Sequence, residues 1–258
     1  MSAKCALVTG ASRGFGRATA ERLSASGSDL ILLARREERL LQQRADLEKR
    51  HKIKVTIAAV DVRDKSQIEK FVHAHQSALA QTDVLINNAG LAKGGDKLSD
   101  GKLADWDEMI DTNIKGLLYI SRAVIPFMLN QQKGHIVNIG SVAGRWVYPG
   151  GAVYCATKFA VRALSEGLRM DLFGTPLRVT NIEPGLAETE FSQVRFNDVD
   201  RAKAVYKGVD ALQANDVAES ILWCLQRPQH VNIQELVIFP TQQAAIQQIH
   251  RRDSAKPV

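Results

Sequence analysis

Apolar and polar residues follow two different periodicities along this chain. Short apolar runs predict β-strands at Cys5–Thr9, Asp29–Leu33, Lys54–Ala59, Asp83–Asn87, His135–Ile139, Arg178–Ile182 and Leu236–Phe239. The stretches between them carry apolar residues at helical spacing and predict helices near residues 14–26, 36–50, 65–80, 105–130, 152–173 and 216–226. Several strands are apolar throughout, as expected when both faces of a strand are buried. Alternation of strands with helices predicts an α/β fold, a doubly wound parallel sheet of about seven strands with helices on both faces.

Two segments and the C-terminal end depart from this alternation. Residues 91–104 are polar and contain glycines, which predicts a loop. Residues 185–215 contain a short charged helical stretch and are long enough to form a lid over a substrate site. Residues 241–258 form a basic tail rich in glutamine, which we expect to be either disordered or docked on a partner subunit. No Pro-, Gly- or Ser-rich linker divides the rest, so we predict a single domain over residues 1–240.

The composition is that of a folded globular protein. The chain has 258 residues, of which 45% are hydrophobic and 24% charged, which excludes collagen-like, disordered and low-complexity classes. Its apolar runs are shorter than the ~18 residues that span a membrane, and Ala6-Leu7-Val8 is too short for a signal peptide. The cysteines are three in number, scattered, and never in C-x-x-C. We therefore expect no disulfides, no membrane partner and a cytoplasmic location.

The net charge of +6 leaves two interpretations of the basic residues, a nucleic-acid surface or a solvated face with a site for an anionic ligand. Lysines and arginines mostly alternate with acidic residues, and Asp46/Arg50 and Glu48/Lys52 have the i, i+4 spacing of a solvent-facing helix. The second interpretation is therefore favoured, with a small molecule as the ligand and no nucleic-acid partner. The six histidines have no metal-ligand spacing with carboxylates or thiolates, so we expect no metal.

A glycine-rich turn follows the first predicted strand. It reads Thr9-Gly10-Ala11-Ser12-Arg13-Gly14-Phe15-Gly16, and a predicted helix comes next. Glycines allow a tight strand-to-helix turn and a close approach of the backbone to a pyrophosphate, and the N-terminus of the helix attracts phosphates. The position and composition of this turn predict a dinucleotide site.

The spacing T-G-x-x-x-G-x-G resembles that of the short-chain dehydrogenase/reductase family, whose members have a Rossmann-type fold. The same family places Asn87-Asn88-Ala89-Gly90 after its fourth strand, Pro184-Gly185 after its sixth, and a catalytic set that matches Asn113, Ser141, Tyr154 and Lys158. The matches occur in order and at family spacing. The resemblance implies a nicotinamide cofactor bound by Gly10, Ser12, Arg13, Gly14, Phe15, Gly16, Arg35, Arg36, Asp61, Val62, Asn88, Tyr154, Lys158, Pro184, Gly185 and Thr189. It implies that Asp61 meets the adenine amino group.

The residues after the second predicted strand bear on which nicotinamide cofactor is used. An enzyme that uses NAD usually holds the ribose 2′-hydroxyl with an acid at this place. Here the chain reads Ala34-Arg35-Arg36, and Arg13 adds a third guanidinium from the glycine turn. Guanidinium groups bind a 2′-phosphate well. The cofactor is therefore predicted to be NADP.

Tyr154 and Lys158 form the motif Y-x-x-x-K, in which helical spacing sets both polar groups on one face. A phenol is a poor base at neutral pH, and we expect the neighbouring ammonium and an oxidised nicotinamide to lower its pKa. Ser141, at the end of the fifth predicted strand, is placed to hydrogen-bond the substrate oxygen. The family resemblance implies that Asn113 holds a water that relays protons to solvent. These roles predict reversible hydride transfer between NADP and a carbinol carbon.

Further strings narrow the resemblance to one subgroup, the NADP-dependent 3-hydroxy acid dehydrogenases that act on serine or allo-threonine and reduce malonic semialdehyde. They include Glu183-Pro184-Gly185-Leu186, Val194-Arg195-Phe196 and His230-Val231-Asn232-Ile233. A hydroxy acid carries a carboxylate, for which Arg195 and Arg145 are both candidate ligands beside Ser141 and Tyr154. Other carbonyl substrates (ketones, sugars or acyl thioesters) and a non-catalytic NADP-binding redox sensor are the alternatives. Family analogy implies a homotetramer that assembles through residues 105–130 and 152–173.

Overall fold

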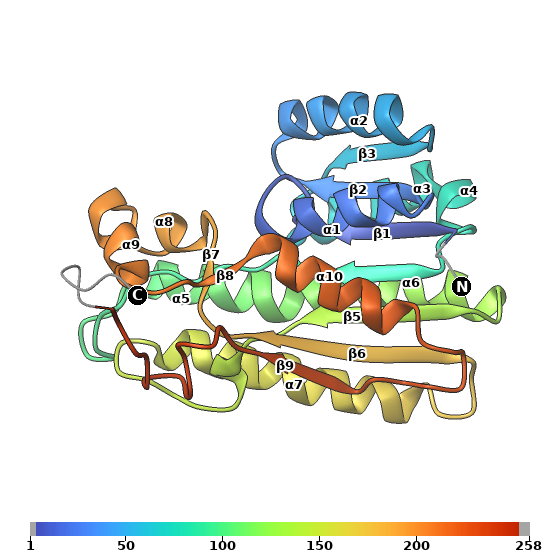
Figure 1. Ribbon diagram of the computed structural model, residues 1–258. Helices are drawn as coiled ribbons and strands as arrows, with labels where there is room; N and C mark the ends of the chain where they lie inside the picture. Colours follow the sequence, from blue (N-terminus) through green and yellow to red (C-terminus); the bar gives the residue numbers. More distant parts are fainter. Residues whose placement is uncertain (1–3, 253–258) are drawn as a thin grey trace.

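The computed structural model describes residues 4–252, which form a seven-stranded parallel sheet. The strands lie in the order β3-β2-β1-β4-β5-β6-β9 (Figure 1). Their bounds are β1 Cys5–Thr9, β2 Asp29–Ala34, β3 Val55–Ala59, β4 Val84–Asn87, β5 Gly134–Ile139, β6 Leu177–Pro184 and β9 Glu235–Ile238. The order reverses between β1 and β4, where connections leave the sheet in opposite directions and a ligand crevice opens beyond the strand ends. The predicted doubly wound sheet is confirmed.

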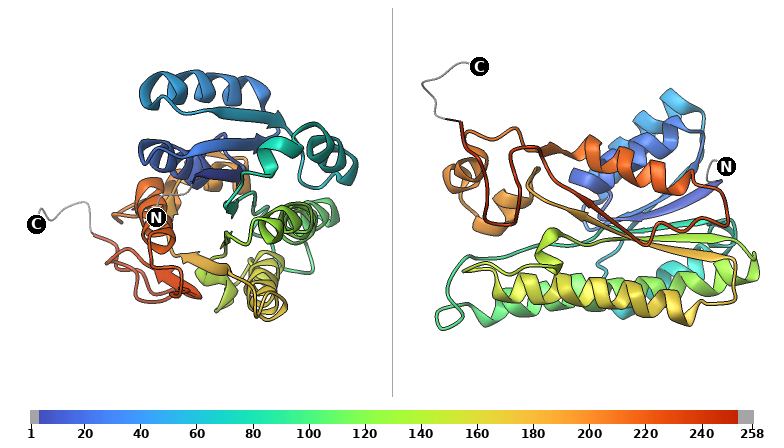
Figure 2. Two further views of the ribbon diagram at one scale, coloured as in Figure 1. Left: turned by 90° about the vertical axis from the view of Figure 1, so that its right-hand side faces the viewer. Right: turned by 60° about the horizontal axis from the view of Figure 1, so that its bottom comes forward.

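Helices cover both faces of the sheet (Figure 2, left). One core lies between the sheet and helices α1 (Gly14–Ala25), α2 (Glu37–His51) and α10 (Ala214–Leu225). The opposite core lies under α3 (Lys65–Ala74), α4 (Gln76–Leu79), α6 (Leu117–Asn130) and α7 (Ala152–Asp171). The central strands are buried on both faces, and some of them are apolar along most of their length, as in Leu30–Leu33 of β2. Strands β5 and β6 also carry buried polar side chains, among them His135 and Glu183.

The helix predicted near residues 105–130 is interrupted. Helix α5 (Leu103–Ile110) leads into a π-helical turn, η1 (Asp111–Gly116), and only then into α6. Asn113 lies in this turn, and its side chain bonds to the backbone of Leu91 rather than to solvent. A π-turn inserts one extra residue into a helix and commonly marks a functional position. The apolar period of the sequence continues through the turn, and only the polar Asn113 within it indicates from the sequence that the helix is interrupted there.

The segment of residues 185–215, which we name the lid segment, has its own small structure. It contains β7 (Ala187–Glu188), α8 (Phe191–Phe196), α9 (Val199–Tyr206) and β8 (Leu212–Gln213), and β7 pairs with β8 in parallel. Asp198 caps the N-terminus of α9, and its carboxylate accepts hydrogen bonds from the backbone N–H groups of Asp200 and Arg201. The lid segment lies beyond the carboxyl end of the sheet (Figure 1).

The tail after Pro240 contacts other parts of its own chain. Through Arg252 it is ordered against the lid segment of its own chain (Figure 2, right). The backbone N–H of Arg252 donates to the carbonyl of Gly208 at 2.8 Å, and the guanidinium of Arg251 donates to the carbonyl of Lys207 at 2.7 Å. The composition of the tail does not encode these long-range backbone contacts. Residues 253–258 of the predicted tail lie outside the described residues.

Candidate active site

A cavity of about 430 Å³ opens at the carboxyl ends of the central strands. It is bounded by the glycine turn, the strand ends, the lid segment and the tail residues Gln243, Ile246, Gln247 and Ile249. Most of the predicted site residues line it, namely Gly10, Ser12, Arg13, Gly14, Phe15, Arg35, Arg36, Asp61, Val62, Asn88, Ser141, Tyr154, Lys158, Pro184, Gly185, Thr189 and Arg195. Three of the predicted site residues do not line the cavity, namely Gly16, Asn113 and Arg145.

The glycine turn is shaped by backbone requirements. Gly10 and Gly14 have φ of 62° and 52°, a left-handed conformation that favours glycine. A Cβ on Gly16 would collide with the carbonyl of Gly10 and the amide of Asn88. The Asn88 amide donates to the carbonyls of Thr9 and Gly10 at 2.9 and 3.2 Å, and so fastens the turn to the end of β4. The turn directs the N-terminus of α1 at the cavity, where unpaired N–H groups favour a phosphate.

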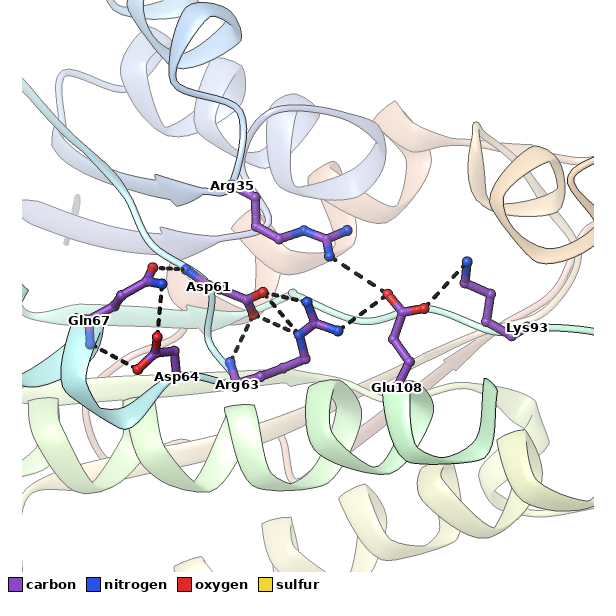
Figure 3. Close-up of polar contacts among 7 residues, drawn as sticks. All are labelled: Arg35, Asp61, Arg63, Asp64, Gln67, Lys93 and Glu108. Atoms are coloured by element: carbon purple, nitrogen blue, oxygen red, sulfur yellow. Dashed lines mark hydrogen bonds and ion pairs between the residues drawn. The ribbon is translucent and has the colours of Figure 1, made fainter. Parts of the chain in front are cut away.

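Arg35 lines the cavity and lies in a network of charges (Figure 3). Its guanidinium is 3.7 Å from the carboxylate of Glu108 on α5, which also contacts Arg63 at 3.5 Å and Lys93 at 3.4 Å. Arg63 in turn binds both carboxylate oxygens of Asp61. Burial raises the pKa of Asp61, but the hydrogen bonds from Arg63 outweigh burial and hold the pKa below its usual value. Asp61 is therefore an anion at neutral pH, oriented by Arg63.

Arg36 belongs to a second cluster of charged side chains, and the sequence predicted only some of its members. Burial lowers the pKa of Arg36, and so does the repulsion from Arg13 and Arg39. The carboxylate of Glu190 lies 3.3 Å from Arg13 and 3.3 Å from Arg39. Arg39 and Glu190 were missed as members of this cluster. The spacing of Arg36 and Arg39, one helical turn apart at the start of α2, was the available signal for Arg39.

Tyr154 is buried beside Ser141 and the ring of Phe191, whose centroid is 5.6 Å away. Burial raises the pKa of the Tyr154 phenol well above its ordinary value, whereas a hydrogen bond with Ser141 and the charge of Arg195 act in the lowering direction. We expected the Lys158 ammonium to lower this pKa. In the structure Lys158 instead donates from Nζ to the carbonyl of Ile139 at 2.7 Å, with Nζ 5.9 Å from the centroid of the tyrosine ring. Burial lowers the pKa of Lys158 to about 8.

Asn113 bridges the loop after β4 and helix α7. Its amide donates to the carbonyl of Leu91 at 2.8 Å and to Thr157 Oγ1 at 3.0 Å, and its carbonyl oxygen accepts from the N–H of Leu91 at 2.9 Å. Thr157 precedes Lys158 on α7. The Asn113 side chain therefore holds two walls of the site together.

The two arginines considered for the substrate anion have different surroundings. Arg195 lines the cavity and donates to Gly94 O at 2.9 Å, Tyr148 Oη at 2.8 Å and Gly150 O at 3.3 Å, which leaves two of its five N–H groups for an anion. Arg145 is bound by the carboxylates of Glu183 and Glu235. The structure therefore places Arg195, and not Arg145, at the cavity.

This geometry has close counterparts among known proteins. The family model of the short chain dehydrogenases matches residues 4–200. Sulfoacetaldehyde reductase 2 of Chromohalobacter salexigens is 46% identical over 92% of this chain and 94% of its own length. The NADP-dependent 3-hydroxy acid dehydrogenase YdfG of Escherichia coli is 45% identical over 95% and 99%. The closed form of serine dehydrogenase complexed with NADP+ superposes with a TM-score of 0.88 at 43% identity, covering 96% of this chain and 100% of that one.

The chain belongs to the short-chain dehydrogenase family. Within that family it is similar to the hydroxy-acid dehydrogenases and sulfoacetaldehyde reductases, so the predicted oxidoreductase class and subgroup resemblance are confirmed. In residues 4–252, no helix is long and apolar enough to cross a membrane.

Proposed function

We propose that this protein transfers hydride reversibly between NADP(H) and a small hydroxy acid or the matching carbonyl compound. The observation that carries this proposal is the position of Arg195, on the same cavity as Tyr154 and with N–H groups to spare. A guanidinium at this place suits a substrate with an anionic group. The predicted substrates are 3-hydroxy acids such as serine, allo-threonine and 3-hydroxypropionate, with malonic semialdehyde reduced in the reverse direction.

The residues present fit NADP as cofactor. Arg13, Arg35 and Arg36 line one end of the cavity, and mutual repulsion among the guanidiniums there is relieved by an anion such as a 2′-phosphate. The E. coli relative is named as NADP-dependent, and the similar serine dehydrogenase structure is a complex with NADP+. Both agree with the predicted cofactor. When bound, NADP supplies or accepts the hydride. The glycine turn would hold its pyrophosphate, and Lys158 and Asn88 its central part.

The protein's own residues handle the proton. Tyr154 donates its phenolic proton to the carbonyl oxygen during reduction and takes it back from the hydroxyl during oxidation. Ser141, which lines the same cavity as Tyr154, orients the reacting oxygen toward the phenol. The raised pKa keeps the phenol protonated at neutral pH, which is the form that carbonyl reduction requires. Arg195 fixes the anionic end, so the reacting carbon of a short substrate lies at a set distance from Tyr154.

A sulfonate substrate is the second candidate, favoured by the 46% identical sulfoacetaldehyde reductase 2. In sulfoacetaldehyde and in a 3-hydroxy acid alike, one methylene or substituted carbon separates the anionic group from the reacting carbon. The same arginine could therefore hold either anion. Reduction of other carbonyls, and a non-catalytic NADP-binding sensor, are the remaining alternatives. Catalysis is favoured over sensing because Ser141, Tyr154 and Lys158 line one cavity.

The test compares steady-state turnover on four substrate types, followed by NADPH absorbance. The first type is the 3-hydroxy acids serine, allo-threonine and 3-hydroxyisobutyrate. The other three are malonic semialdehyde, sulfoacetaldehyde, and neutral alcohols of similar size. Arg195→Ala should raise KM for the anionic substrates about tenfold or more, the scale of a charged hydrogen bond, and leave neutral alcohols much less affected. Arg195→Lys serves as the matched variant that keeps the charge. An equal rise in KM for charged and neutral substrates would contradict the proposal that the substrate carries an anionic group.

We further propose a homotetramer in the cytoplasm. Apolar side chains are exposed on the helices named for assembly, including Leu118 on α6 and Phe159 and Met170 on α7. Such a face suits a subunit interface. The cysteines Cys5, Cys155 and Cys224 are buried and free, in keeping with a reducing compartment. Light scattering coupled to gel filtration measures the subunit number, and a monomer would contradict this assembly.

A further inference from the structure

Glu190 links the lid segment to the cofactor half of the molecule. It immediately precedes α8, and its carboxylate oxygens contact Arg13 Nη1 and Arg39 Nη1, each at 3.3 Å. Arg13 belongs to the glycine turn, and Arg39 to the first turns of α2. Glu190 is 42% exposed, so these ion pairs are accessible to water and exchangeable. They are contacts that an incoming anion can replace.

The charges around Glu190 match a phosphate. Arg13 and Arg39 both repel Arg36, and Glu190 is the carboxylate that offsets this repulsion. Three guanidiniums and one carboxylate leave two positive charges, and a phosphate monoester carries about −1.5 to −2 at pH 7. A phosphate that enters this cluster gains the attraction of the arginines and meets the repulsion of Glu190. Glu190 and the phosphate therefore compete for the same guanidiniums.

The helix that follows Glu190 reaches the substrate side. Phe191, its first residue, packs on the ring of Tyr154, and Arg195 near its end contacts Tyr148 on the cavity wall. A change at Glu190 therefore acts on a short helix that carries the residue proposed to hold the substrate anion. Glu190, beside the arginines, and Arg195 therefore stand at opposite ends of that element.

We propose that Glu190 is a counter-charge that ties the lid segment to Arg13 and Arg39, and that the 2′-phosphate of NADP releases this tie by competing with Glu190 for both guanidiniums. The inference rests on the proposed binding of the 2′-phosphate by the arginine cluster. NAD has a hydroxyl group at that position and leaves the tie in place. Glu190 thus makes the lid segment respond to the phosphate that distinguishes the two cofactors.

The first measurement is the affinity of NADP and of NAD by titration calorimetry. Glu190→Gln removes the competing charge at constant size, so NADP should bind about threefold tighter or more while NAD changes little. Glu188→Gln is the matched control, because Glu188 is exposed two residues earlier in the same segment and carries the same charge. Weaker NADP binding by Glu190→Gln, or affinities equal to those of the wild type, would overturn the inference.

The second measurement is hydrogen exchange of peptides that cover residues 187–206, with saturating NADP or saturating NAD. In the wild type these peptides should exchange at different rates with the two cofactors, because only NADP breaks the tie. In Glu190→Gln the two rates should coincide, because the tie is missing with either cofactor. A merely structural role would shift both rates together. Equal rates in the wild type would overturn the response of the lid segment.

Arg36→Gln separates this inference from the proposed function. If the arginine cluster does not bind the 2′-phosphate, Arg36→Gln will leave the preference for NADP over NAD unchanged, and the proposed binding of the 2′-phosphate fails together with the role of Glu190 that is built on it. If Arg36→Gln reduces that preference while Glu190→Gln alters neither affinity nor exchange, only the role of Glu190 fails.

Discussion

The guanidinium of Arg145 donates from Nε to the carboxylate of Glu183, a side chain on β6 with no exposed surface. Asn181 donates to the same carboxylate at 2.7 Å. Burial raises the pKa of Glu183, and the charge of Arg145 opposes that rise. Arg145 follows the loop that carries Ser141, so its partner on β6 braces this loop. A guanidinium committed to a buried carboxylate is not free for a substrate.

Arg145→Ala is therefore expected to act on stability. Removing one partner of a buried pair leaves an uncompensated carboxylate, which costs about 3 kcal/mol in the free energy of unfolding. Urea denaturation of the wild type and of Arg145→Ala measures this loss, and the added change Glu183→Gln should recover part of it. The KM for serine relative to a neutral alcohol should stay the same. A selective rise in that ratio would instead make Arg145 a substrate ligand.

Tyr154→Phe tests the assignment of the acid/base. Removing the hydroxyl removes the proton donor, so kcat should fall by at least ~10²-fold while NADP binding is largely kept. The matched control is Tyr148→Phe, a neighbouring cavity residue whose hydroxyl binds Arg195 and not the reacting oxygen. It should affect KM more than kcat. Near-normal turnover by a folded Tyr154→Phe would contradict the assignment.

The pH profile should differ between the two directions of reaction. Oxidation needs a phenol that can lose its proton, and burial raises the pKa of Tyr154, so kcat/KM for oxidation should rise from about pH 6 to about pH 9. Reduction uses the protonated phenol and should stay nearly flat through neutral pH. Arg195→Gln removes a charge that lowers this pKa and should move the oxidation profile to higher pH, whereas Arg195→Lys should not. An oxidation rate that falls with pH would exclude Tyr154 as the base.

Arg36 should contribute more to the preference for NADP than Arg35 does. Two rim contacts of ~1 kcal/mol each give the wild type a preference of at least ~30-fold in kcat/KM. Glu108 holds Arg35 at 3.7 Å, so Arg35→Gln should cost less of that preference than Arg36→Gln, which should cost about fivefold or more. NAD should be nearly unaffected by either change. Equal loss of both cofactors would show that the arginines are structural.

His135 should make stability fall in acid. It is buried in β5, where its Nε2 lies 2.7 Å from Thr180 Oγ1, and burial together with the charge of Arg178 lowers its pKa to about 3. The unfolded chain, with an ordinary histidine, binds the proton more readily below about pH 6.5, so stability drops by up to ~1.4 kcal/mol per pH unit on that side. Denaturation at several pH values measures the slope. His135→Gln should flatten it, whereas His73→Gln, at an exposed position, should not.

By itself the sequence determined the strands, the parallel sheet and the glycine turn. These depend on neighbouring residues: apolar runs form buried strands, and a turn with left-handed backbone at Gly10 and Gly14 needs glycine. Helix ends were predicted to within a few residues for the same reason, since α7 runs from Ala152 to Asp171 against an expected 152–173. The resemblance to the motifs of the family also brought Ser141, Tyr154 and Lys158 into one group, and these residues share the cavity.

Only the tertiary structure decided which side chains meet across long separations. Arg145 and Arg195 look alike in sequence, yet one contacts a buried carboxylate on β6 and the other faces the cavity. Two further contacts join residues that are far apart in the sequence. Glu190 contacts Arg13, 177 residues away, and the backbone N–H of Arg252 donates to the carbonyl of Gly208. An ion pair or backbone contact of this kind depends on how whole elements pack, and a local pattern of residues carries no information about a partner that far along the chain.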